Sequence, residues 1–426
     1  MFPGARSRGC NAHRRALAVV VTAVAMISLT SLSAADAKNA PARARSNNQI
    51  RGGRLMVAHG DNFTTGAMVM QTKLRTASGD VPLVVPASAH ATVLALAGHG
   101  VQVRGSRIAA SSTVQPKVAH AVGAMRIAVV LMRLPGSTAE PVSKAAVKMS
   151  TFGPTNSVAQ WYSQMSGGQV AVTGTVYGYF PGVRTCDLST QLDAAAAAAR
   201  RSGYVASNYD HLVVYTPTQS CAFAGIGWVG ENGVFLNGST TPGLMEHELG
   251  HNLGVWHAGR YACGAAPFSA KCLLVYGDPA DVMGDPYSNH GYSAEHKHAL
   301  GWIPDAEVRT VASGTQTIAL TASEDPVVAG STELIHLRAT DGTLYAIDRR
   351  ASIGYDAGLS GVWIRRVASL NSDDTQLVRN GALGAGATFT DPVHHVTIKT
   401  LADSGPRASV QVCVGACTAA RKPTAQ

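Results

Sequence analysis

The residues best suited to do chemistry are a glutamate and three histidines that lie close together in the sequence. His247 and His251 are four residues apart, so on an α-helix both imidazoles project from one face, with Glu248 beside them. Gly254 can take the left-handed conformation that ends a helix, and the turn can bring His257 round as a third nitrogen ligand. Three protein ligands leave one position of a tetrahedral zinc ion open for water, which is typical of a catalytic zinc site.

The composition argues against a chance match at these five positions. With 15 histidines and 44 glycines among 426 residues, the probability of a chance match is on the order of 10⁻⁴. The flanks also favour a helix, because Thr241 can cap it and Pro242 suits its first position. An apolar side for packing comes from Leu244, Met245, Leu249 and Leu253.

This constellation predicts hydrolysis of an amide bond. One zinc ion held by three neutral imidazoles would lower the pKa of its water to about 7. Glu248, which is not a ligand in this arrangement, would take the proton of the water as general base and return it to the leaving amine.

Further motifs downstream carry a resemblance to a known family. They are Tyr276–Gly284, which contains Met283, then Gly291–Ala294 and Leu300–Trp302. With the zinc motif, they make the chain resemble the gametolysin (autolysin) family of metzincins, most clearly from about Ile127 to Trp302. The resemblance implies a metzincin-type zincin fold with a mixed sheet and an active-site helix, and it implies that Met283 forms an apolar floor under the histidines.

The resemblance also suggests two further kinds of site residue. Related enzymes use a tyrosine soon after the Met-containing turn as an extra ligand or oxyanion donor, and Tyr287 and Tyr292 are the candidates here, although neither matches the spacing. Metzincins also bind substrate along a sheet-edge strand before the zinc helix, by β-augmentation. We assign that role to Gly225, Ile226, Gly227 and Trp228, against the alternative of a plain surface loop.

The amino terminus and the charge predict an exported protein. Residues 1–37 combine arginines, an apolar run and a small-x-small cleavage site, as a signal peptide does. The mature protein is expected to be secreted, extracellular or periplasmic, with no membrane span. The net charge of +9 comes from scattered Lys and Arg, so nucleic acid is not expected as a partner.

The cysteine count agrees with export. Six cysteines remain after the signal peptide, an even number that suits an oxidising compartment. Six cysteines allow fifteen pairings, and nearest-neighbour closure predicts Cys186 with Cys221, Cys263 with Cys272, and Cys413 with Cys417. A second metal on Cys263 and Cys272 is the competing interpretation.

Residues 38–122 are predicted to form a β-rich prosegment or N-terminal domain that ends in a cleavable linker from 110 to 116. Because no cysteine lies between Lys38 and Thr185, a thiolate cannot keep the enzyme latent. The residues that could cap the metal instead are Asp61, His59, His90 and His99.

The rest of the chain divides into two predicted domains. Residues 123–304 alternate strands with helices, as in an α/β sheet; the strands are 127–131, 170–179 and 211–215, and the helices are 157–165 and 187–202. Residues 305–426 contain strands without helices, which predicts a C-terminal all-β, sandwich-like domain. Its strands are 316–321, 333–338, 344–348, 361–367, 395–400 and 408–412.

We therefore expect a secreted, monomeric zinc endopeptidase that acts on proteins or peptides. The family resemblance suggests a cell-wall glycoprotein or an extracellular matrix protein as the substrate. Two alternatives stay open: a wall-binding or adhesion protein with an idle metal site, and a peptidoglycan amidase. The sequence does not indicate the cleavage preference or whether calcium is bound.

Overall fold

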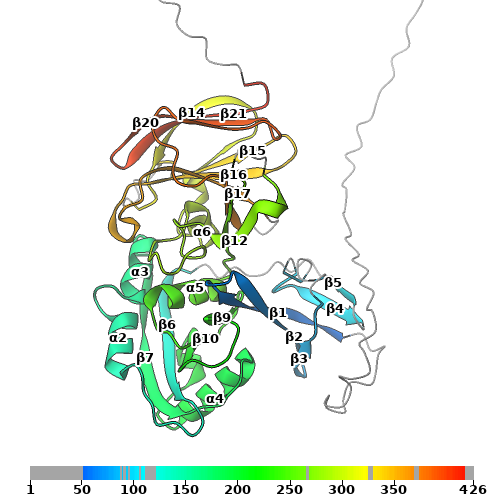
Figure 1. Ribbon diagram of the computed structural model, residues 1–426, viewed down its shortest axis with the longest axis vertical. Helices are drawn as coiled ribbons and strands as arrows, with labels where there is room; N and C mark the ends of the chain where they lie inside the picture. The colour runs from blue at the N-terminus through cyan, green and yellow to red at the C-terminus, as the bar shows by residue number, and fades with distance from the viewer. Residues whose placement is uncertain are drawn as a thin grey trace, which may run out of the picture.

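The computed structural model describes residues 51–417 except 87–88, 90–92, 95, 105–106, 111–120, 265–267, 325–329 and 369–373. The predicted signal peptide, His90 and most of the predicted linker lie outside the described residues. Within this part of the chain, the fold is a mixed α/β arrangement of three sheets (Figure 1).

A large mixed sheet forms the lower half of the molecule in Figure 1. Its strand order is β3-β2-β1-β9-β10-β8-β6-β7, with β4 paired to β1 and β5 to β4. Strands β7, β6, β8 and β10 run parallel to one another, whereas β9 is antiparallel to β10. The strands of this sheet that come after residue 122 are β6 (Gly123–Arg133), β7 (Val170–Pro181), β8 (His211–Thr216), β9 (Gly225–Trp228) and β10 (Val234–Asn237).

Helices cover both faces of this sheet, which explains the continuous apolar run in β6. Ile127, Val129 and Leu131 face a core shared with α3 and α5, and the alternate residues Ala128 and Val130 face α4. The predicted strands and helices of this region are confirmed, and α2 is added to them. The helices are α2 (Lys144–Phe152), α3 (Val158–Met165), α4 (Leu188–Arg200), α5 (Pro242–Leu253) and the short η3 (Ala206–Asn208).

The predicted prosegment is β-rich, as expected, and it extends the large sheet. Its strands are β1 (Arg51–Asn62), β2 (Ala67–Thr76), β3 (Gly79–Leu83), β4 (Gly100–Arg104) and β5 (Arg107–Ala110). Strand β1 pairs antiparallel with β9, in register from Ala58 opposite Trp228 to Asp61 opposite Gly225. Strand β9 is therefore not a free edge in this structure.

Two more sheets lie at the other end of the molecule. A mixed sheet has the order β12-β11-β18-β17-β16-β15-β13, and an antiparallel sheet has the order β14-β21-β20-β19. Buried side chains of both sheets, such as Ile347 and Val410, share one core. The strands are β11 (Ala258–Tyr261), β12 (Leu273–Gly277), β13 (Val308–Val311), β14 (Gly314–Thr321), β15 (Leu334–Arg338), β16 (Leu344–Arg350), β17 (Gly361–Val367), β18 (Thr375–Leu377), β19 (Thr388–Asp391), β20 (Val396–Ser404) and β21 (Arg407–Val414).

The six strands predicted after residue 305 are present, but the mixed sheet also takes in β11 and β12, which precede that position. The boundary predicted at 304/305 therefore cuts through one hydrogen-bonded sheet. The remaining helices are α6 (Ala294–Ala299) and three short 3-10 helices, η4 (Ala270–Cys272), η5 (Asp305–Glu307) and η6 (Gly354–Asp356).

The three predicted disulfides are confirmed: Cys186–Cys221, Cys263–Cys272 and Cys413–Cys417. The alternative of a second metal on Cys263 and Cys272 is wrong, because both sulfurs are taken up in one disulfide. Such bridges are consistent with an oxidising, extracellular-type environment. None of the helices in the described part of the chain has the length and apolar character needed to cross a bilayer.

Candidate metal centre

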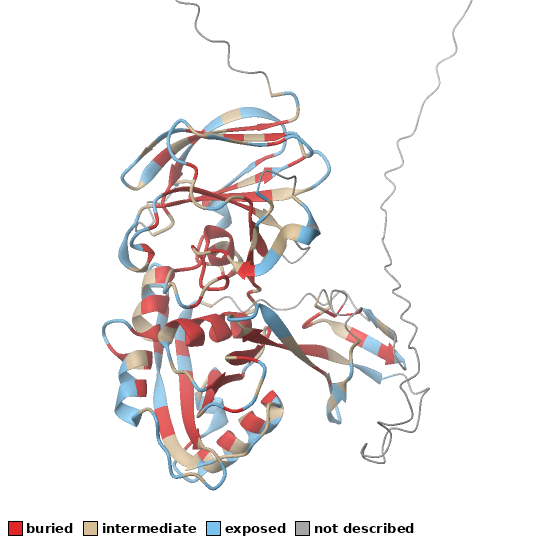
Figure 2. Ribbon diagram, viewed as in Figure 1, coloured by how far each residue is buried: buried red, intermediate tan, exposed pale blue. Residues whose placement is uncertain are grey.

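Helix α5 supplies two of the three predicted ligands and lies in the interior, where Figure 2 shows it buried. Pro242 occupies its first turn, and every residue from Gly243 to Leu253 is buried. Thr241 is at the N-cap position but makes no capping hydrogen bond with its side chain. Gly254 ends the helix with a φ of 100°, a left-handed conformation that glycine takes without a steric penalty, and this turn redirects the chain toward His257.

The three histidines converge on one carboxylate, that of Asp61. The Nε2 atoms of His247 and His251 lie 3.0 and 3.2 Å from its Oδ2, and Nε2 of His257 lies 3.2 Å from its Oδ1. All four residues are buried. Two overlapping buried groups here could hold a metal ion: His59, Asp61, His251 and His257 form one, and Asp61, His247 and Glu248 the other.

The donor set of the three imidazoles fits a metal. Nδ1 of His247 faces the Val282 carbonyl and Nδ1 of His251 faces the Val255 carbonyl, each at 2.9 Å. A carbonyl only accepts, so each Nδ1 carries a proton; in the neutral imidazole Nε2 then offers its lone pair to a metal, as in metal-bound histidines, whereas without a metal a proton on Nε2 would be shared with Asp61. Burial also lowers the pKa of His251 and His257, which favours the neutral form that binds metals.

Asp61 reaches the centre because β1 lies along β9. Its Oδ1 also accepts a hydrogen bond from the Tyr276 hydroxyl at 2.5 Å and lies 3.0 Å from Nδ1 of His59. Burial alone would raise the pKa of Asp61, but the imidazoles of His257 and His59 outweigh it and hold the pKa well below its usual range. The carboxylate is therefore anionic at the position where a metal ion or its water would lie.

Glu248 lies beside this cluster without a hydrogen-bond partner. Among the described residues, neither of its carboxylate oxygens has one, although the side chain is fully buried. Burial and the nearby charge of Asp61 raise the pKa of Glu248 well above its usual value. A Cβ at Gly225 would overlap this carboxylate, and a Cβ at Gly227 would lie 2.8 Å from the Glu248 carbonyl. The two glycines thus let β9 pass directly over Glu248.

Met283 lies beneath the helix, in the same core as α5. A Cβ added at Gly250, between the two helical histidines, would come within 2.7 Å of the Met283 sulfur. The residues from 276 to 284, which we call the Met turn, therefore pack closely against the ligand-bearing face of α5.

The structure brings neither candidate tyrosine into contact with Asp61. Tyr292 is fully buried, and its hydroxyl donates to the Glu246 carbonyl at 3.4 Å. Tyr287 is 59% exposed, and its ring lies 5.7 Å from that of Phe63. Tyr276 is the tyrosine at the centre, since its ring lies 4.5 Å from that of His257. The sequence shows that Tyr276 precedes Met283 in the motif. It does not show that the Tyr276 side chain points toward His257.

The amino-terminal segment also fills the space next to the histidines. The Phe63 ring lies 4.9 Å from the ring of His247 and 5.4 Å from that of Tyr276. A cavity of about 640 Å³ continues from there between Phe63, Arg260 and Tyr287. Of the other proposed metal caps, His59 contacts Asp61, whereas His99 lies beside Leu55, toward the other end of β1.

Comparisons with known proteins add no family. The chain matches no protein-family model and no curated protein. Among 22 matching chains of solved structures is one described as "Structure of a chaperone-substrate complex", with 14% sequence identity and a TM-score of 0.24. That match covers 50% of this chain and 33% of the other, so the chain spans about a third of its length. A likeness this weak carries no argument about fold or function.

Proposed function

We propose that this chain is a secreted zinc-dependent endopeptidase of the metzincin type, and that β1 and Asp61 hold it in a latent form. The observation that carries the proposal is the convergence of three buried Nε2 atoms beside the unpartnered carboxylate of Glu248, with Nδ1 of His247 and of His251 each facing a backbone carbonyl. His247, His251 and His257 would hold the metal. Zinc bound there would act as a Lewis acid that acidifies water and polarises the scissile carbonyl.

The protein's own groups supply the proton transfers. Glu248 accepts the proton of the attacking water and passes it to the leaving amine, since no other group in the described structure occupies its oxygens. Burial is the larger cause of the raised pKa of its carboxyl, and a raised pKa suits a group that first accepts and then returns a proton. The Tyr276 hydroxyl, which now donates to Asp61, would be free to donate to the oxygen of the substrate carbonyl.

An extended polypeptide is the substrate that the site favours. Strand β1 shows that β9 accepts a peptide strand in antiparallel register, with a side chain directed at the histidines. Backbone pairing of this kind is the basis of β-augmentation. It favours endopeptidase action over attack on an isolated peptidoglycan amide, and the retained Glu248 disfavours an idle metal site.

Latency follows from the same pairing. Strand β1 covers β9, Asp61 would compete with water for the remaining metal position, and Phe63 lies against His247. Activity then requires that residues 58–63 leave the site.

To test the proposal, we would measure how fast the Asp61→Ala chain cleaves a denatured protein. We expect zinc-dependent cleavage, and we expect Glu248→Gln in that background to slow it by roughly 10²–10⁴-fold while zinc stays bound. Glu246→Gln is the matched control, because Glu246 is equally buried in α5 and both its oxygens also lack a hydrogen-bond partner among the described residues, but only Glu248 lies with His247 in the candidate metal cluster. Undiminished cleavage by the Glu248→Gln chain would exclude the assigned base, and absence of zinc from the Asp61→Ala chain would exclude the site.

A further inference from the structure

The carboxy-terminal region reaches the proposed metal ligands along two routes. The first ends at His257, whose carbonyl accepts a hydrogen bond from the Thr375 amide at 3.2 Å. The residues after His257 then continue as β11, which pairs in parallel with β18 from Ala258 opposite Thr375 onward. The backbone of the third ligand is therefore held by a strand that lies more than a hundred residues downstream.

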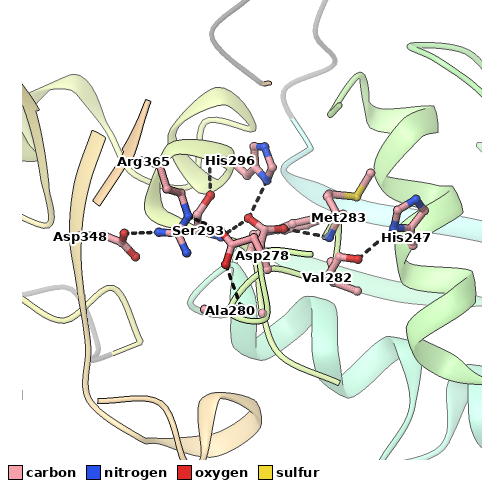
Figure 3. A network of polar contacts seen from close by, with 12 residues as sticks. His247, Asp278, Ala280, Val282, Met283, Ser293, His296, Asp348 and Arg365 are labelled. Carbon is pink, nitrogen blue, oxygen red and sulfur yellow. Dashed lines mark hydrogen bonds and ion pairs between the residues drawn. The ribbon is translucent and has the colours of Figure 1, made fainter. Parts of the chain in front are cut away.

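The second route ends at His247 and passes through the Met turn, as Figure 3 shows. The Val282 carbonyl faces Nδ1 of His247 at 2.9 Å and so sets the tautomer of this ligand. On one side of Val282, the Asp281 carboxylate accepts the Met283 amide at 2.9 Å and the Ser293 amide at 2.7 Å. It also pairs with His296 at 2.8 Å.

On its other side, the Met turn is held by Arg365, which is fully buried on β17. Nε of Arg365 donates to Asp278 Oδ2 at 2.6 Å, while Asp278 Oδ1 accepts the Ala280 amide at 3.0 Å. Nη1 of the same guanidinium donates to Asp348 on β16 at 2.5 Å. Arg365 thus links two carboxylates, one in the turn and one in the carboxy-terminal sheet (Figure 3).

A second buried arginine supports the same turn. Arg350 donates from Nη2 to the carbonyls of Ala280 and Tyr292, at 3.0 and 2.6 Å, and its Nε donates to Asp348 at 2.9 Å. Fully buried ion pairs have a large desolvation cost, so a hydrophobic contact could hold the domains together at least as well. What the guanidinium of Arg365 adds is direction, because its Nε and Nη1 point at two different carboxylates.

We infer that Arg365 is a positioning residue for the metal ligands, acting through Asp278 and the Met turn on His247. The inference rests on the proposed zinc site and adds that residues after 305 form part of the scaffold of that site. Lysine in place of Arg365 would keep the charge, but a single ammonium group cannot reproduce the two directed contacts.

The test measures zinc affinity, by competition with a chromogenic chelator, in the Asp61→Ala background. We expect Arg365→Lys to weaken zinc binding by roughly 10- to 100-fold, the range found when outer-shell partners of metal ligands are changed. The visible absorption bands of the cobalt-substituted protein should shift too, because they report ligand geometry. Arg366→Lys is the matched control, since Arg366 is the next residue of β17 and contacts Tyr261, not the Met turn.

The outcomes separate this inference from the proposed function. Unchanged zinc affinity and cobalt bands in a folded Arg365→Lys chain would overturn it, even if its melting temperature fell. If that chain does not fold, Asp278→Asn removes the charge from the same contact, and the same two readouts decide. A parent chain that binds no zinc would instead overturn the proposed function.

Discussion

The amino-terminal strands and the carboxy-terminal sheets both reach the candidate metal centre, but they attach to the molecule in different ways. Strands β1 to β5 are held by the pairing of β1 with β9, by the packing of Met56, and by partly exposed ion pairs such as Arg54 with Glu231. Exposed pairs of this kind contribute about 0–1 kcal/mol each. Residues after 305 share a sheet with β11 and β12 and contribute the buried Arg350 and Arg365.

This difference indicates opposite roles. In the proposed enzyme the amino-terminal region places Asp61 and Phe63 where substrate would lie, so this region has to leave the site before substrate can bind. Removal of the Arg365 guanidinium alone would leave the buried Asp278 without its charged partner, and breaking a buried pair in this way costs about 3–5 kcal/mol. The amino-terminal region covers the histidines, and the carboxy-terminal region supports the Met turn beneath them.

We expect the largest effect from a deletion of the carboxy-terminal region, which tests its supporting role directly. A chain that ends at residue 304 loses β18 beside β11 and Arg365 beside Asp278, so we expect no cooperative thermal unfolding and no zinc binding. Full-length protein cut between residues 111 and 120, and then separated from its amino-terminal part, should still unfold cooperatively. Circular dichroism with elemental analysis measures both, and a truncated chain that folds and binds zinc would contradict the supporting role.

Asp61→Ala should have the next largest effect. Hydrogen bonds to a charged group contribute about 1.5–3 kcal/mol, so removing this carboxylate should raise the peptidase activity of the uncut chain by about 10- to 100-fold. Asp80→Ala is the control, because Asp80 belongs to the same sheet and forms its ion pairs with Lys73 and Arg75, away from the histidines. Equal activity of the uncut parent and Asp61→Ala chains would mean that Asp61 does not block the site.

A smaller effect should appear in the acid range. Burial opposes ionisation of Asp281, but His296 and the Ser293 amide outweigh it and lower the pKa of its carboxyl below the unfolded value of 3.8. The carboxylate therefore stabilises the fold above that pH, and this contribution is lost as the pH falls below it. Thermal unfolding between pH 3 and 7 should show that Asp281→Asn costs about 1–3 kcal/mol at neutral pH and progressively less in acid.

The exposed Asp305 provides the comparison for that experiment, since its side chain is fully exposed. Asp305→Asn should leave the acid limb of the stability curve unchanged. If Asp281→Asn were equally destabilising at pH 3 and pH 7, its charge would not be what holds the Met turn.

Local patterns predicted much of the fold, and the reason is geometric. Helix α3, helix α4 and strand β6 follow from periodicity that each segment carries by itself, and each is present. The mixed sheet that crosses residue 305 was not predictable in this way, because β11 and β18 are short and their parallel pairing joins residues more than a hundred positions apart. The three disulfides were predicted by pairing each cysteine with its nearest neighbour in the sequence.

The sequence by itself determined the arrangement of His247, Glu248 and His251, since the pitch of a helix places residues four apart on one face, and Gly254 determined where that helix ends. Only the tertiary structure decided that Asp61 reaches His247, 186 residues away, and that Tyr276, not Tyr287 or Tyr292, contacts it. It also decided that Arg365 faces Asp278. These contacts depend on which strands lie side by side, and sequence spacing carries no information about that.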